Sequence, residues 1–298
     1  MINKDTFSSF HPVINFLYFA LVLVFSMWFM HPACLLISLV CSICYHLSLA
    51  DKKAFGFTMR YMLPLAILTI IINPAFSHQG FTILAYLPTG NPLTLESILY
   101  GIAAAVMLVS VIEWFACYSE VMTSDKFVYL FGRIIPALSL VLSMTLRFLP
   151  KFSAQLKQVK KAQQSIGRDT ANGSVFQRIR NGATILSIMI TWSLENAIET
   201  ADSMKSRGYG LPGRTAFSIY KFDKRDKLAL VWLLCCGAYI LVGWKMKAFR
   251  FLYYPGIVWP VFSVINVSFF VVYFMLCITP MVINYSEELT WKKLRSAV

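Results

Sequence analysis

Two arginines lie beside glycines in the basic middle part of an otherwise apolar chain. Arg168 follows Gly167, and Arg207 precedes Gly208. A guanidinium is planar and permanently charged, and it binds a carboxylate through two parallel hydrogen bonds. Glycine often ends a helix, and the helix dipole favours a cation at that end. The two arginines therefore either cap two helices and anchor them at an interface, or insert into two equivalent acidic grooves of a partner, such as a dimer.

Other residue types that perform chemistry are scattered along the chain. The four histidines form no HExxH pair, and the sequence has no GxxxxGK[ST] nucleotide-binding motif. Cys41 and Cys44 have CxxC spacing, but they lie within an apolar run without a second pair, which favours helix packing over a metal or redox site. Glu113 lies in another apolar run and is expected to pair with a basic residue. We therefore predict no catalytic residue, no cofactor and no metal site.

The composition is that of a membrane protein. Of the 298 residues, 58% are hydrophobic and 14% are charged, whereas soluble domains have about 25% charged residues. Long uncharged runs predict an all-α, polytopic membrane bundle with cytoplasmic amphipathic helices. The net charge of +13 comes without a nucleic-acid-binding module, so we assign it to the bilayer surface and expect no nucleic acid partner. About six spans are expected, at Pro12–Met30, Ala33–Ala50, Met59–Ile72, Ser97–Cys117, Leu228–Met246 and Ile257–Val282.

The distribution of Lys and Arg orients these spans. Lys52, Lys53 and Arg60 place the connection after the second span inside, whereas Asn73–Glu96 has neither Lys nor Arg and is placed outside, as a surface hairpin or a re-entrant piece. Positions 147–227 hold 15 of the 27 basic residues and are placed inside. Both termini are then cytoplasmic. The expected domains are an N-terminal transmembrane bundle at 1–118, cytoplasmic helices at 119–227, and C-terminal spans with a tail at 228–298.

The first cytoplasmic helix is predicted from an apolar stripe. Pro150 is expected in its first turn, and Gly167 ends the helix. The stripe consists of Phe152, Leu156, Val159 and Ile166.

The second cytoplasmic helix is predicted to end at Arg207-Gly208 and to carry on one face Leu194, Ile198, Ala201 and either Met204 or Lys205. Two apolar pieces, Ile134–Met144 and Ala183–Trp192, lead into the two helices. We expect long helices at the inner interface rather than a membrane hairpin, because each apolar piece runs directly into a charged amphipathic stretch.

Several short segments are similar to motifs of one membrane protein family, namely Thr145–Pro150, Ala162-Gln163, Gly167-Arg168-Asp169, Ser193–Ala197, Met204–Gly210 and Gly213–Thr215. Through them the chain resembles the T component of energy-coupling factor (ECF) transporters, the transmembrane coupling subunit of vitamin and metal-ion importers. The similarity extends over most of the chain, and its specific part is the second arginine motif in its sequence context.

The resemblance implies that the cytoplasmic helices are coupling helices with a small-Arg-small motif at each end. Each motif would dock into a groove of one of two ABC-type ATPase subunits. Asp169 departs from the pattern, because it is neither small nor neutral. The residues assigned to ATPase docking are Gly167, Arg168 and Asp169 for one ATPase and Ser206, Arg207 and Gly208 for the other.

The resemblance also implies a third partner, a small membrane-embedded S component that binds the substrate. ATP-driven movement of the coupling helices would tip the S component and release its cargo. The chain itself would be a non-catalytic subunit in the cell membrane of a prokaryote, serving vitamin or metal-ion uptake. Contacts with the S component are expected at Phe152, Leu156, Val159, Leu194, Ile198 and Ala201.

Two alternatives differ in what the spans must contain. A substrate-conducting permease of an ordinary ABC importer needs a polar pathway through the spans, and these spans have few polar residues. An intramembrane enzyme needs His, Asp or Glu residues converging at one depth. The sequence favours the coupling subunit over both.

Overall fold

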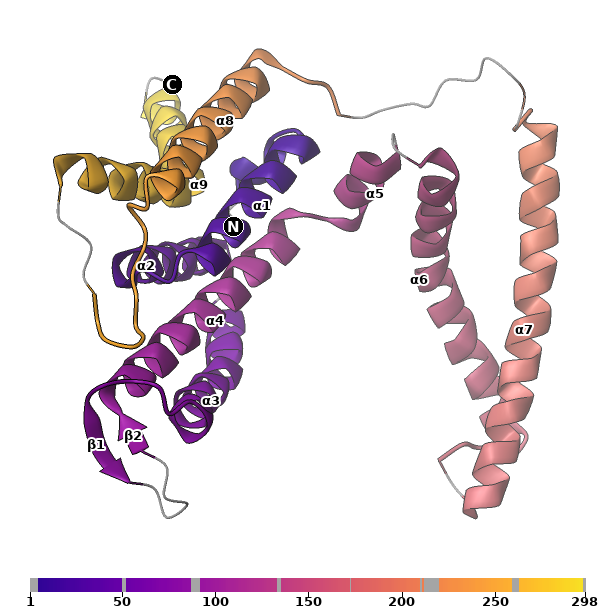
Figure 1. Cartoon of the computed structure of the whole chain (residues 1–298). Helices are drawn as coiled ribbons and strands as arrows, with labels where there is room; N and C mark the ends of the chain where they lie inside the picture. The colour runs from indigo at the N-terminus through magenta and orange to yellow at the C-terminus, as the bar shows by residue number, and fades with distance from the viewer. Residues whose placement is uncertain are drawn as a thin grey trace. The chain divides into compact units, whose positions relative to one another are not determined.

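A computed structural model describes residues 5–49, 52–86, 92–132, 135–171, 173–209, 211, 220–258 and 263–296. The chain divides into two compact units (Figure 1). The first comprises Met1–Lys126 and Tyr220–Val298, and the second comprises Phe127–Ile219. A short helix, α5 (Ser124–Gly132), crosses the boundary between them.

The first unit is a bundle of six apolar helices. Among the residues that the structure describes, five of these helices are long and apolar enough to cross a membrane; in α3 the apolar part is Met59–Phe76. α1 has 17 residues, about 26 Å against a hydrocarbon core of about 30 Å. The expected all-α polytopic fold is confirmed. The bounds are α1 (Pro12–Trp28), α2 (Pro32–Leu49), α3 (Lys52–Phe76), α4 (Leu95–Val121), α8 (Lys224–Lys245) and α9 (Val264–Ser296).

The bundle core is built from aromatic side chains whose polar tips are hydrogen-bonded. Tyr18, Trp114 and Tyr273 are fully buried. The Trp114 indole donates to Ser38 Oγ at 3.0 Å, and the Tyr18 hydroxyl donates to the Cys277 carbonyl at 2.9 Å. These bonds connect α4 with α2 and α1 with α9, so the large rings pack without leaving a buried donor unpaired.

Glu113 of α4 contacts His46 of α2, with the imidazole Nδ1 on carboxylate Oε2 and both side chains buried. The expected basic partner is therefore a histidine. Cys41 is buried and Cys44 is exposed on the same helix, and both are free thiols.

The segment between α3 and α4 forms a β-hairpin. β1 (Ile83–Tyr86) pairs antiparallel with β2 (Pro92–Thr94), which agrees with the hairpin alternative for this stretch. The Thr94 hydroxyl accepts from the Ser97 N–H and caps α4, while Glu96 accepts from the Thr82 hydroxyl at 2.9 Å. The hairpin is thus fixed to the first turn of α4.

The last span differs from its prediction at both ends. It was expected at Ile257–Val282, but α9 begins at Val264 and continues to Ser296. Residues 252–258 form a turn instead, closed by the Val258 N–H donating to the Leu252 carbonyl at 3.1 Å. The adjacent Pro255 and Gly256 favour such a turn over a helix.

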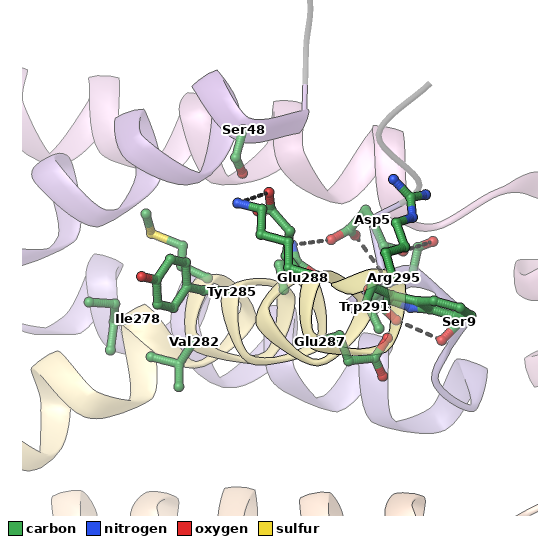
Figure 2. A pocket seen from close by; sticks show the side chains of 15 residues that line it. Asp5, Ser9, Ser48, Ile278, Val282, Tyr285, Glu287, Glu288, Trp291 and Arg295 are labelled. Carbon is green, nitrogen blue, oxygen red and sulfur yellow. Dashed lines mark hydrogen bonds and ion pairs between the residues drawn. The ribbon is translucent and has the colours of Figure 1, made fainter. Parts of the chain in front are cut away.

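The C-terminal part of α9 faces the N-terminal segment across a cavity of about 1440 Å³ (Figure 2). Asp5 accepts a hydrogen bond from Asn284, whose own side-chain oxygen accepts from the Phe7 N–H at 3.0 Å. Arg225 of α8 forms an ion pair with Glu287 at 3.2 Å. The contacts of Asn284 hold the N-terminal segment against α9, and the ion pair joins α8 to α9.

Candidate functional site

The second unit contains the arginine motifs on two long helices, α6 (Pro136–Ser165) and α7 (Val175–Ser206). Both predicted amphipathic helices are therefore present as helices, and they include the apolar pieces from Pro136 and from Ala183 onward. One expectation is wrong: α6 begins at Pro136, so Pro150 lies inside the helix rather than in its first turn. A proline removes one backbone hydrogen bond, and the packing of its neighbours carries the helix through that position.

α6 and α7 pack antiparallel. Trp192 of α7 stacks on Phe148 at 5.5 Å between ring centroids and lies 6.3 Å from Phe152. Lys151 donates to the Asn196 side chain at 2.6 Å and lies 5.7 Å from the Trp192 ring, within cation–π range. Early residues of α6 thus meet late residues of α7, as an antiparallel hairpin requires.

Next to these aromatic contacts, and packed against Phe152 and Trp192, an apolar cluster closes the hairpin nearer its turn. Val159 of α6 packs with Ile185 and Met189 of α7, and all three are buried. The two clusters together fix the register of the helices.

α6 ends in a Schellman motif built on Gly167. This residue has φ +77°, a left-handed conformation that side chains disfavour. Its N–H donates to the Gln164 carbonyl at 3.0 Å, and the Arg168 N–H donates to the Gln163 carbonyl at 2.9 Å. The prediction that Gly167 ends the helix is confirmed, and Arg168 is the first residue beyond it.

α7 ends in the same motif built on Gly208, whose φ is +71°. The Gly208 N–H donates to the Lys205 carbonyl at 2.9 Å, and the Tyr209 N–H donates to the Met204 carbonyl at 3.0 Å. Arg207 is the cap residue itself. The predicted end at Arg207-Gly208 is confirmed.

Asp169 builds the turn between the helices. Its carboxylate accepts from the Ala171 N–H at 3.0 Å and from the Gln164 amide at 3.2 Å. The Ala171 N–H is the main cause that holds the pKa of the Asp169 carboxyl below its ordinary value. The Asp169 carbonyl accepts from the Asn181 amide at 2.8 Å. Asp169 thus positions the chain that follows Arg168, a role that its departure from the family pattern did not reveal.

α6 and α7 run in opposite directions (Figure 1), and each arginine follows the C-terminal end of one of them, so the two arginines lie at opposite ends of the hairpin. Arg168 follows the turn-side end of α6, and Arg207 closes the far end of α7, a helix of 32 residues or about 48 Å. Both arginines are exposed. Such an arrangement provides two separate contacts joined by one stiff element.

The residues expected to contact an S component divide into two groups. Val159 is 9% exposed and Phe152 packs beside it, so both contribute to the hairpin interface. Leu156, Leu194, Ile198 and Ala201 are exposed. Sequence reasoning missed the continuation of this apolar face along α7, although its spacing of three, seven and four residues was visible in the sequence. The further exposed residues are Phe176, Ile179, Leu186 and Ile190.

The fold and the helical hairpin define an all-α polytopic membrane protein with an arginine at each of two helix ends. The family model of CbiQ, the cobalt transport protein, matches residues 10–219, which is more than half of the chain. The chain therefore belongs to this family.

Curated relatives agree with that assignment. The chain is 32% identical over 109 residues to the energy-coupling factor transporter transmembrane protein EcfT of Lactobacillus helveticus, covering 36% of this chain and 39% of that protein. It is 34% identical over 107 residues to EcfT 1 of Listeria monocytogenes, covering 35% and 40%. An uncharacterized MG181 homolog of Mycoplasma pneumoniae is 27% identical over 163 residues, covering 51% and 38%. The matches thus span about two fifths of these relatives, and the predicted resemblance to the ECF transmembrane component is confirmed.

Proposed function

We propose that this chain couples ATP hydrolysis by two ABC-type ATPase subunits to an S component that carries the substrate. The observation that carries the proposal is the placement of Arg168 and Arg207 at opposite ends of one hairpin. In this proposal each arginine docks into one ATPase, and ATP is hydrolysed by those partners. The chain lies in the cell membrane of a prokaryote with both termini cytoplasmic.

The packing of the hairpin supports mechanical coupling. The aromatic cluster around Trp192 and the cluster around Val159 hold α6 and α7 in one register. Because packed side chains resist sliding, a displacement applied at one helix end moves the other helix with it. A hairpin without these two clusters would absorb such a displacement.

The exposed apolar face of α7 supports contact with the S component. Ile190, Leu194 and Ile198 recur every four residues and are each more than half exposed. A stripe of this kind suits an amphipathic helix lying against another membrane protein or at the bilayer surface. The imported substrate belongs to the vitamin or metal-ion class in this proposal, and the match to the cobalt transport protein family agrees with a metal ion.

Affinity purification of the tagged chain from native membranes in mild detergent tests the proposal. We expect two ABC-type ATPases and a small, very hydrophobic protein to co-purify. Lys157→Ala is the matched control for Arg168→Ala and Arg207→Ala, because Lys157 is an exposed basic residue within α6, away from both arginine-bearing ends. Recovery of no ATPase with the wild-type chain would refute the proposal.

Substrate binding provides a second test. The purified chain alone is expected to bind vitamins and metal ions no better than empty lipid discs. Saturable binding to the isolated chain would favour a substrate-conducting permease instead.

A further inference from the structure

The two helix ends share one backbone conformation. The cap residue of α6, Ile166, has φ −99° and ψ 17°. The cap residue of α7, Arg207, has φ −84° and ψ 9°. The following glycines have φ +77° and +71°, and each motif closes with the same pair of backbone hydrogen bonds. By this correspondence Ile166 occupies the position of Arg207, and Arg168 occupies the position of Tyr209.

The side chains therefore occur in opposite order at the two ends. α6 presents isoleucine, glycine and arginine, whereas α7 presents arginine, glycine and tyrosine. Ile166 is 63% exposed and Tyr209 is 45% exposed, so each end offers one large apolar or aromatic side chain beside its guanidinium.

The order matters because, when the two motifs are aligned, Arg168 lies two residues later in its motif than Arg207. Alpha carbons two positions apart are roughly 5–7 Å apart, whereas hydrogen bonds form within a range of about 0.5 Å. A groove whose carboxylate meets Arg207 would present that carboxylate to Ile166 at the other end. The carboxylate would then be desolvated without a partner, which is unfavourable.

We propose that the two ends dock in opposite registers and that Ile166 determines which ATPase is accepted at the α6 end. This inference rests on the proposed function. The ATPase at α6 has an apolar pocket for Ile166 where the ATPase at α7 has acidic groups for Arg207. The two grooves are accordingly different, in contrast to the pair of equivalent grooves that the two arginines alone suggest. Each end rejects the other's ATPase through a mismatched charge.

An order swap tests this proposal. The chain is co-expressed with the two ATPases, each carrying a different tag, and both are quantified after capture through the chain. The double variant I166R/R168Y gives α6 the side-chain order of α7. We expect its capture of the α6-end ATPase, relative to the other ATPase, to fall by about tenfold or more. R207I/Y209R is expected to show the converse loss.

Milder variants separate docking from folding. Ile166→Leu keeps an apolar cap residue and is expected to retain both ATPases, whereas Ile166→Gln places a polar group there and lowers capture of the α6-end ATPase alone. Wild-type capture of both ATPases by I166R/R168Y would overturn the inference. So would equal loss of both ATPases from a variant that still elutes as a single species.

The two proposals fail in different ways. If the wild-type chain captures no ATPase, the proposed function is wrong. If the wild type captures both ATPases and Ile166→Gln, which keeps both arginines, captures both equally well, the proposed function stands and the assignment to Ile166 is wrong.

Discussion

Replacing Gly167 by alanine tests whether a closed helix end is needed to present Arg168. A β-carbon built at Gly167 has no neighbouring atom within 4 Å, so the substitution introduces no clash. The residue nevertheless has φ +77°, where L-amino acids other than Gly are strained. The cost is therefore almost entirely backbone strain, about 1–2 kcal/mol.

This strain acts on the last turn rather than on the whole hairpin. The Val159 cluster and the Trp192 cluster remain intact, so the variant is expected to keep its overall melting temperature. If docking requires the closed turn, a strain of about 1–2 kcal/mol weakens binding of the α6-end ATPase by about 5- to 30-fold.

The assay is titration of that ATPase onto the chain in lipid nanodiscs. Gly167→Asn should have a smaller effect, because asparagine tolerates the left-handed conformation better than alanine does. Gly182→Ala is the matched control: its β-carbon also has no neighbour within 4 Å, but Gly182 lies inside α7, where alanine is favoured by up to about 1 kcal/mol. Wild-type affinity in Gly167→Ala, or an equal loss in Gly182→Ala, would refute the reasoning.

Three further perturbations have defined outcomes. Trp192→Ala removes the contacts with both phenylalanines of α6 and should destabilise the hairpin by about 2–4 kcal/mol, measured as faster limited proteolysis of the second unit; unchanged cleavage would contradict the packing described above. Because the pKa of Asp169 is lowered, its carboxylate stabilises the turn above the ordinary pKa of an aspartate, and this contribution is lost as the pH falls through the lowered value. Hydrogen exchange at the Ala171 amide should therefore lose protection on acidification in the wild type, and an Asp169→Ala variant that still showed this change would disprove the assignment. Gly80→Ala would bring its β-carbon to 2.5 Å from the Glu96 carboxylate and 2.9 Å from Thr94, so we expect a lower thermal midpoint of the purified protein, and an unchanged midpoint would argue against this packing.

The helix ends of the candidate site could be predicted from the sequence because their cause is local. Gly167 and Gly208 adopt a conformation that few other residues tolerate, and each follows a long amphipathic run. The start of α6 could not be predicted in the same way. The preference of proline for a first turn is only statistical, and the contacts of Phe148 and Phe152 with Trp192 outweigh it.

Contacts between distant parts of the chain could not be predicted from the sequence either. The apolar stripe identified Val159 as a packing residue, but a stripe does not say whether its partner is α7 or another protein. Glu113 meets His46 only because α2 and α4 lie side by side. The correspondence of Ile166 with Arg207 likewise depends on backbone hydrogen bonds at each helix end, whereas the sequence shows only an arginine beside a glycine in both places.

The central claim is that Arg168 and Arg207 each hold one ATPase. The most direct measurement is the stoichiometry of ATPases in complexes of the wild type, Arg168→Ala, Arg207→Ala and the double variant, determined by native mass spectrometry and combined with substrate uptake by cells. We predict loss of a different ATPase from each single variant. The double variant should lose both ATPases and uptake while its melting temperature is unchanged. Full occupancy and full uptake in the double variant would show that the two arginines only cap their helices.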